Sequence, residues 1–209
     1  AAGNQKLGKI AGVLEMKQTG LTKYLKTLID LDILEREVPI TEESPEKSKR
    51  GLYRIKDNFL LFWFKFIYPN LSLIESGHSE IAMKKIQSNF IDNHVSYVYE
   101  DICLEILWKL NGDGAWDFHF ERAGRWWDGQ NEIDIVALDS DGNNIIFGEC
   151  KYWRSPIGLD ILEKLRLKSS AVEWNRDKRT EYYILFSISG FTQDLVDYAQ
   201  EHKNVILYC

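Results

Sequence analysis

Two kinds of hydrophobic spacing divide this chain of 209 residues. Up to about residue 110 the apolar residues mostly recur every three or four positions, which is typical of amphipathic helices. Beyond Gly114, short apolar runs bounded by turn residues predict strands that alternate with helices. The expected elements are helices over residues 80–110, 159–174 and 192–202, and strands over residues 116–122, 132–138, 144–151, 182–188 and 205–208. This order predicts an α/β fold with a mixed sheet flanked by helices, in which the late strands run parallel.

The N-terminal segment combines two short amphipathic helices with a strand pair. A helix over about residues 7–14 is followed by a break at Thr19-Gly20 and by a second helix from Leu21. Apolar stretches at residues 33–38 and 51–55 then flank a charged loop, which predicts two strands around a wing. The whole segment resembles a winged-helix domain.

Two lysines mark the outer face of the second of these helices. Lys23 and Lys26 are placed to reach DNA phosphates if this helix lies in a groove. A solvated helix face on a packing or protein-contact module explains the same lysines. Acidic residues of the charged loop would repel DNA: Glu42, Glu43 and Glu46. Both interpretations remain open from these residues alone.

Three regions complete the predicted domain organisation: a winged helix over residues 1–57, a linking helix and loop over residues 58–79, and the mixed sheet over residues 80–209. The run from Asp57 to Asn70 is too aromatic for a free linker, so it predicts a buried helix whose rings pack rather than stack on a ligand. Because periodicity begins directly after Ala1-Ala2-Gly3, we expect the chain to be part of a longer polypeptide.

Composition narrows the functional classes. The chain is 44% hydrophobic and 28% charged, and no apolar run approaches the roughly 20 residues that span a bilayer. We therefore expect no membrane partner. The three cysteines lie far apart without disulfide or zinc-ligand spacing, so we expect an intracellular, cytoplasmic protein: Cys103, Cys150 and Cys209. The net charge of −6 argues against a broadly basic surface that coats nucleic acid, although a local basic patch can still follow phosphates. Motifs for a phosphate-binding loop, a dinucleotide fingerprint, a serine elbow and an HExxH metal pair are absent from the sequence.

The segments 132–138 and 144–151 form a predicted hairpin that is apolar except at one end. If Leu138 pairs with Ile145 across the Asp-Gly turn, side-chain alternation fixes which residues face each other. This register sets two pairs opposite each other: Asp134 with Glu149, and Glu132 with Lys151.

Two carboxylates facing each other in a sheet repel, so a cation is expected between them. The Lys151 ammonium is one candidate, and a proton shared by Asp134 and Glu149 is another. A divalent ion such as Mg²⁺ is the third, since it prefers carboxylate oxygens and water. A cross-strand ion pair with Glu132 is the alternative for Lys151.

The residues around this end carry a family resemblance. Gly124-Arg125-Trp126-Trp127, Glu132 to Ala137, and Phe147-Gly148-Glu149-Cys150-Lys151-Tyr152-Trp153 resemble the PD-(D/E)XK nuclease superfamily. More narrowly, the chain resembles the C-terminal region of archaeal AAA-type ATPases, including the winged helix that joins ATPase and nuclease-like domain, with Tyr53 to Phe59 and Phe62-Trp63-Phe64 as matching residues. The resemblance implies that an ATPase domain of the same polypeptide precedes this chain.

The resemblance also implies roles for individual residues. Asp134, Glu149 and the helix carboxylate Glu100 would ligate Mg²⁺ or Mn²⁺, and Lys151 would be the catalytic lysine of phosphodiester hydrolysis. Ile133 stands where the superfamily pattern has proline. Arginines near this end could contact phosphates, and the two tryptophans are expected to pack against the sheet rather than stack on bases: Arg122, Arg125, Arg154, Trp126 and Trp127.

Three functions fit this chemistry. The first is a DNA-associated, metal-dependent endonuclease attached to an archaeal ATPase. The second is a catalytically inactive module that binds DNA or protein and regulates the ATPase. The third is a restriction-like toxin or defence effector, which would share the chemistry of the first.

Overall fold

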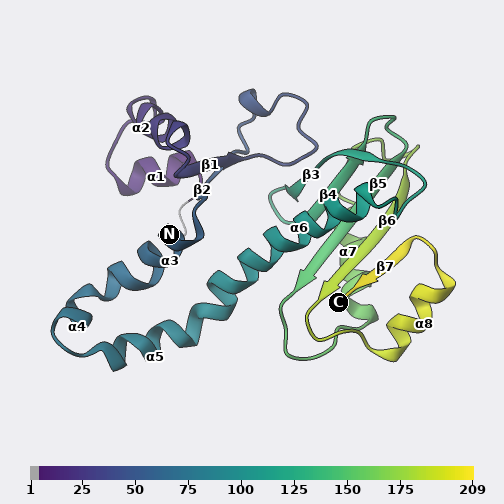
Figure 1. Cartoon of the computed structure of the whole chain (residues 1–209). Coiled ribbons are helices and arrows are strands. Elements are labelled where there is room, and N and C mark those ends of the chain that lie inside the picture. Colours follow the sequence, from purple (N-terminus) through teal and green to yellow (C-terminus); the bar gives the residue numbers. More distant parts are fainter. Residues whose placement is uncertain (1–4) are drawn as a thin grey trace. The chain divides into compact units, whose positions relative to one another are not determined.

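The computed structural model describes residues 5–209, which divide into two compact units (Figure 1). The first contains the described residues up to Val38 together with Ser44–His94, and the second contains Pro39–Glu43 together with Val95–Cys209. Residues 58–94 therefore group with the N-terminal helices. That residues 1–57 and 80–209 are the functional domains stays a prediction.

The first unit is mainly helical and carries one small sheet. Strands β1 (Leu34–Glu37) and β2 (Leu52–Ile55) pair antiparallel, as the apolar stretches around the charged loop predict. Ala11, Leu21 and Leu25 form the buried core beside them. The two amphipathic helices are confirmed, and their assignment to the winged-helix fold stays a prediction. The helices are α1 (Leu7–Val13), α2 (Gln18–Asp30), η1 (Pro45–Lys47), α3 (Asn58–Phe62), η2 (Trp63–Ile67), η3 (Tyr68–Asn70), α4 (Leu71–Glu75), α5 (Ser79–Phe90) and η4 (Ile91–Val95), of which η2 and η4 are π-helical.

The aromatic run after Asp57 folds into consecutive short helices rather than one. The Asp57 carboxylate accepts a hydrogen bond from the Leu60 amide at 2.7 Å and so caps α3. In η2, Phe66 is buried and packs edge-to-face against Phe90, with ring centroids 5.8 Å apart. Phe59 is 66% exposed. The prediction that this whole run is buried is therefore wrong.

The second unit is an α/β structure around a five-stranded mixed sheet, which confirms the predicted fold class. Its strands lie side by side in sequence order, the first three antiparallel and the last three parallel. The parallel pairing of the late strands was predicted from the helices between them. The elements are α6 (Ser96–Gly112), β3 (Phe120–Trp127), β4 (Glu132–Asp139), β5 (Asn144–Lys151), α7 (Leu159–Ser169), β6 (Thr180–Ser187), α8 (Gln193–Glu201) and β7 (Val205–Tyr208).

Strand β3 begins later than its sequence predicts. The expected strand over residues 116–122 is replaced by one that starts at Phe120 and runs to Trp127. The Asn111 side chain accepts a hydrogen bond from the Phe120 amide and donates one to the Phe120 carbonyl, each at 3.1 Å. These two hydrogen bonds fix the residue at which β3 starts. Trp116, in the loop before the strand, packs against the Phe120 ring.

Helix α7 ends five residues before the predicted end at Trp174. Its last residue is Ser169, and the guanidinium of Arg179 donates hydrogen bonds to the carbonyls of Ser169, Val172 and Trp174 at 3.1, 2.5 and 2.6 Å. These bonds satisfy carbonyl groups that a continuing helix would have paired internally.

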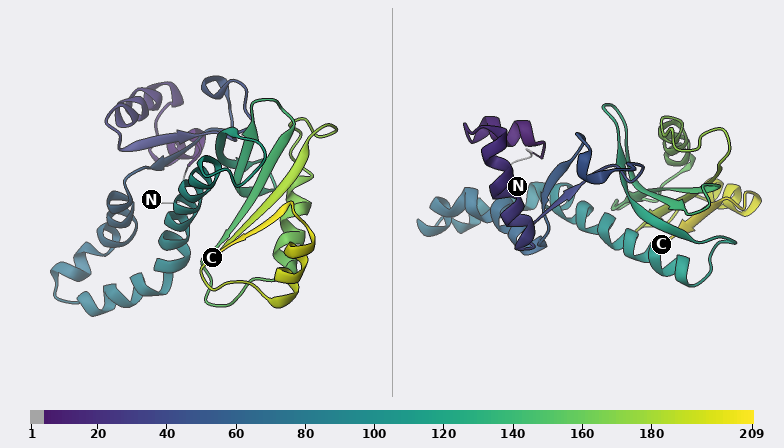
Figure 2. Two further views of the ribbon diagram at one scale, coloured as in Figure 1. Left: turned by 45° about the vertical axis from the view of Figure 1, so that its right-hand side comes forward. Right: turned by 90° about the horizontal axis from the view of Figure 1, so that it is seen from above.

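Both faces of the sheet are covered, as the apolar character of the central strands predicts. Figure 2 shows α6 on one face and α7 on the other. Cys103 and Leu107 of α6 pack with Ile135 and Ile146, whereas the α7 face is built from another set: Ile161, Leu162, Leu165, Val136, Leu138, Ile145 and Phe147. None of the helices in residues 5–209 is long and apolar enough to cross a membrane.

Candidate functional site

The register of the β4–β5 hairpin is the predicted one. Leu138 pairs with Ile145, and Ile135 pairs with Gly148. Gly142 in the turn has φ of +75°, a left-handed conformation that glycine adopts without strain. The apolar part of the hairpin therefore fixes which residues extend beyond the last pair.

Asp134 lies just beyond this paired part of β4. Its carboxylate Oδ2 accepts a hydrogen bond from the backbone amide of Cys150 at 2.8 Å, so its side chain reaches β5. Burial and then the nearby Glu149 carboxylate raise the pKa of Asp134 to about 6, although the Lys151 ammonium and the Cys150 hydrogen bond oppose this shift. Asp134 is thus mostly ionised at pH 7, although burial and the Glu149 charge disfavour the ionised form.

Glu149 lies between two ammonium groups. It is 6% exposed. Lys151 Nζ lies 2.6 Å from its Oε1, while Lys168 Nζ of α7 lies 3.1 Å from Oε1 and 2.9 Å from Oε2. Both contacts are partly buried, where charges interact more strongly than in water. Glu149, the most buried carboxylate of the site, therefore has two cationic partners.

Lys151 pairs with Glu149 along β5, and Glu132 pairs with Arg125, so the alternative cross-strand ion pair of Lys151 with Glu132 is not formed. Burial lowers the pKa of Lys151, but the Glu149 and Asp134 carboxylates outweigh burial and raise it above its ordinary value of 10.5. Lys151 is therefore an ammonium group at neutral pH. It can neutralise negative charge or donate hydrogen bonds, and it cannot accept a proton there.

Lys168 is a residue of this cluster that the sequence did not predict. It follows Ile161 by seven positions and Leu165 by three, so it lies on the stripe of α7 that faces the sheet. A lysine on an otherwise apolar stripe was the available signal. Its partner could not be inferred, because nothing in the sequence aligns the end of α7 with the end of β5.

Glu100 is brought near the hairpin through Arg125. Arg125 lies 2.8 Å from Glu100 and 2.9 Å from Glu132, and so connects α6, β3 and β4. Burial raises the pKa of Glu100 to about 8; the Arg125 guanidinium counteracts this, and the charges of Asp134 and Glu132 add to it. Glu100 is therefore mainly neutral at pH 7.

The carboxylates as arranged do not form a ready metal centre. Within residues 5–209, no group of three or more histidine, cysteine, aspartate or glutamate side chains converges in a way that could hold a metal ion. The contacts explain this result, because Glu149 faces two lysines and Glu100 faces Arg125. A cation at this end of the hairpin would have to replace one of these internal partners.

Four further predicted nucleic-acid contacts lie on other elements or have partners of their own. Lys23 and Lys26 are exposed on α2, where Lys26 pairs with Asp30 at 3.0 Å, and Arg154 is exposed after β5. Arg122 donates hydrogen bonds to the Ile40 and Glu42 carbonyls. The two tryptophans at the end of β3 are buried, as predicted: Trp126 and Trp127.

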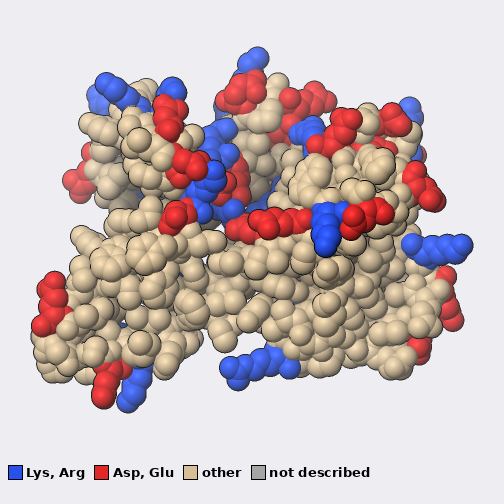
Figure 3. Space-filling view, viewed as in Figure 1, with Lys and Arg blue, Asp and Glu red and all other residues tan. Residues whose placement is uncertain are grey.

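Charge on the visible surface is mixed. On the face shown in Figure 3, lysine and arginine side chains are interspersed with aspartate and glutamate instead of forming one broad basic area. This distribution agrees with the net charge of −6. Any contact with nucleic acid on this face must therefore be local.

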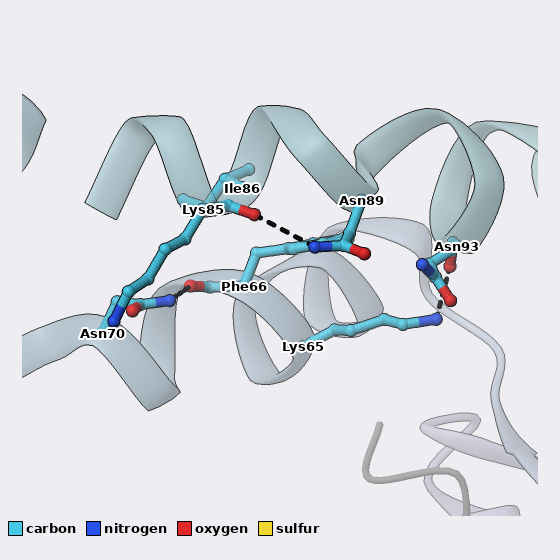
Figure 4. A pocket seen from close by; sticks show the side chains of 7 residues that line it. All are labelled: Lys65, Phe66, Asn70, Lys85, Ile86, Asn89 and Asn93. Carbon is cyan, nitrogen blue, oxygen red and sulfur yellow. Dashed lines mark hydrogen bonds between the residues drawn. The ribbon is translucent and has the colours of Figure 1, made fainter. Parts of the chain in front are cut away.

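A polar cavity of about 270 Å³ lies in the first unit between η2–η3 and α5–η4. Figure 4 shows Lys65 and Lys85 with their ammonium groups at opposite ends of it. The Lys65 ammonium donates a hydrogen bond to the Asn93 carbonyl, and Asn70 Nδ2 donates one to the Phe66 carbonyl at 2.9 Å. These side chains satisfy carbonyl groups of the irregular helical turns. The polar side chains that line the cavity therefore have a structural role in these turns.

Comparisons with known proteins agree on the region that contains the hairpin. Residues 63–166 match a family of archaeal and bacterial proteins of unknown function. A protein of Methanocaldococcus jannaschii, itself described as uncharacterised, is 42% identical over 161 residues, which are 77% of this chain and 35% of the relative. The chain thus spans about a third of the length of that relative. No solved structure matches the chain.

The family match includes the predicted catalytic residues and ends just before another residue of the site. Glu100, Asp134, Glu149 and Lys151 all lie within residues 63–166. Lys168 lies two positions beyond the match. The comparison therefore delimits a related region without assigning chemistry to it.

Proposed function

We propose that this chain carries a metal-dependent site for phosphodiester hydrolysis and that its substrate is nucleic acid, most simply DNA. One observation carries the proposal: Asp134, Glu149 and Lys151 meet where β4 begins and β5 ends, next to Glu100 from α6. Carboxylates with a protonated lysine beside them suit a reaction in which a cation and a phosphate share one site. The resemblance to PD-(D/E)XK nucleases supports the same reaction.

The donor chemistry of the site fits a hard divalent cation. Asp134 and Glu149 offer carboxylate oxygens, which Mg²⁺ and Mn²⁺ prefer. The pKa of Asp134 is raised to about 6 and that of Glu100 to about 8, mainly by burial, so an added positive charge would favour their ionised forms. When bound, such an ion lowers the pKa of its water and stabilises negative charge on a phosphate.

The residues of the chain have distinct tasks in this proposal. Asp134 and Glu149 hold the cation, and Glu100 contributes a third carboxylate once it is ionised. Lys151, being protonated, stabilises the charge that develops on the phosphate oxygens or orients the attacking water. Arg125 keeps Glu100 and Glu132 in place from β3.

Binding of DNA is proposed to involve separate basic residues. Lys23 and Lys26 on α2 and Arg154 after β5 are exposed, which suits contacts with the phosphate backbone. We further propose that an ATPase domain of the same longer polypeptide works with this chain. The relative that is about three times as long as the matched segment leaves room for such a domain.

A second candidate function is a catalytically inactive module that binds DNA or protein for the ATPase. The observation that favours it is that internal partners occupy the carboxyl groups: Lys151 and Lys168 contact Glu149, and Arg125 contacts Glu100. A site that stays closed in this way would serve the structure alone. Substituting Asp134 or Lys151 would then leave the biological activity intact.

A cleavage assay distinguishes the two candidates. Linear and circular DNA are incubated with the native chain, Asp134→Ala and Lys151→Met, each with Mg²⁺, Mn²⁺ or EDTA. The nuclease proposal expects products from the native chain only, and only with a divalent ion. Equal products from all three proteins would identify a contaminating nuclease, and no products from any of them would favour the inactive module.

A further inference from the structure

Lys168 is a second cation on a carboxylate that already has one. Lys151 contacts only Oε1 of Glu149, whereas Lys168 Nζ lies 3.1 Å from Oε1 and 2.9 Å from Oε2. The Lys168 side chain is 29% exposed and that of Lys151 is 19% exposed. Of the two, Lys168 is thus the lysine that spans both carboxylate oxygens and has more access to solvent.

The position of Lys168 has a consequence for cation binding. A divalent ion that binds a carboxylate through both oxygens takes the place in front of that pair of atoms. The Lys168 ammonium occupies this place on Glu149. Because Lys168 comes from α7 on a long flexible stem, it can leave without any movement of β5. Lys151 lies two positions along the same strand as Glu149 and remains beside it.

We propose that Lys168 holds Glu149 in the cation-free site and that a divalent ion binds by displacing the Lys168 ammonium. This inference rests on the proposed function, since it concerns the same carboxylates. It adds a residue that competes with the cation. The Lys168 contact with Glu149 is the observation that carries it.

The test is titration of Mn²⁺ into the whole chain, followed by calorimetry, without any nucleic acid. Lys168→Met keeps the apolar stem and removes the charge, so the affinity for Mn²⁺ is expected to rise about tenfold, the effect of one partly buried ion pair. Lys168→Arg should bind no more tightly than the native chain. Lys164→Met is the matched control: Lys164 lies on the same helix, pairs with Asp160 at 2.8 Å and should leave the affinity unchanged.

The outcomes separate this inference from the proposed function. Equal or weaker Mn²⁺ binding by Lys168→Met would overturn the competition, even if the native chain cleaves DNA. Tighter binding without cleavage by any protein would support the competition and count against catalysis. If neither protein gives a heat of binding, Lys168 does not compete with a divalent ion, and the proposed hydrolysis does not depend on Mn²⁺ at this site. Lys168→Gln provides the same comparison if thermal melting shows that Lys168→Met is unfolded.

Discussion

The two ends of the β4–β5 hairpin place buried carboxylates in opposite surroundings. At the turn end, Asp139 is 8% exposed and accepts hydrogen bonds from the amides of Asn143 and Asn144, each at 3.0 Å, and from Asn144 Nδ2 at 2.7 Å. At the other end, Asp134 has one backbone amide and Glu149 has two lysines. Only neutral donors surround Asp139, whereas charges surround the other two.

The donors around each carboxylate distinguish one that stabilises the fold from one that is available for chemistry. Asp139 closes the turn, and its oxygens are occupied by backbone and amide groups that cannot leave without breaking the turn. The partners of Glu149 are lysine side chains, and the Lys168 ammonium can leave without a change in the backbone. A carboxylate whose partners are cationic side chains can accept a different cation in their place.

The largest expected effect is on cleavage by Asp134→Asn. Loss of one carboxylate charge should lower DNA cleavage at least about 100-fold if the site holds a catalytic cation. The fold should persist, because the amide can still accept the hydrogen bond from Cys150. Product formation on linear DNA and far-ultraviolet circular dichroism are the two measurements. If the variant cleaves DNA as fast as the native chain, Asp134 is not needed for catalysis and does not differ in that respect from Asp139.

Asp139→Ala should show the opposite behaviour. It leaves the amides of Asn143 and Asn144 without their acceptor, which costs about 2–3 kcal/mol of stability. Cleavage by the protein that remains folded should be unchanged. Urea unfolding gives the stability, and the exposed Asp141→Ala in the same turn is the control, with an expected change near zero. A stable Asp139→Ala protein would show that the turn does not depend on this carboxylate.

Glu100→Gln should reduce the dependence of stability on pH. The folded chain raises the pKa of Glu100 from 4.5 to about 8, so the stability that its neutral form provides is complete below pH 4.5 and is lost as the pH rises through 8. The native chain should therefore weaken between pH 5 and pH 9 by about 4 kcal/mol more than Glu100→Gln. Chemical denaturation at several pH values measures this. The exposed Glu105→Gln on α6 should follow the native chain.

The smallest effect is expected for Lys23→Ala and Lys26→Ala. Because these lysines lie on α2 and not at the hairpin, their loss should weaken DNA binding modestly and lower the slope of log affinity against log salt by about 1 per phosphate contact. The rate of cleavage at saturating DNA should not change. Fluorescence anisotropy at several salt concentrations measures the slope. An unchanged slope would mean that α2 is a solvated face.

The hairpin register could be predicted from the sequence because several local signals agree. Apolar residues on both faces identify β4 and β5 as central strands, and the Asp-Gly turn requires the φ of +75° found at Gly142. One residue out of register would have buried polar side chains. The paired part of the hairpin, from Leu138 with Ile145 to Ile135 with Gly148, was therefore determined by short-range patterns.

The partners of the site residues could not be predicted in the same way. Lys168 meets Glu149 across 19 positions, and the start of β3 depends on the Asn111 side chain, which precedes it by nine positions. Both contacts depend on where a helix ends relative to the sheet. The position of a helix end relative to the sheet depends on tertiary packing, which cannot be inferred from the hydrophobic periodicity of either segment.

Residues Pro39–Glu43 belong to the second unit, although the stretches on both sides of them belong to the first. The Ile40 amide donates a hydrogen bond to the Arg125 carbonyl at 3.0 Å, so this short stretch covers part of β3 at the outer border of the sheet. A recombinant fragment beginning at Val95 would lack this cover. The exposed edge of β3 could then pair with β3 of another copy, and we expect the fragment to aggregate. The smallest piece for laboratory study must therefore start upstream of Pro39.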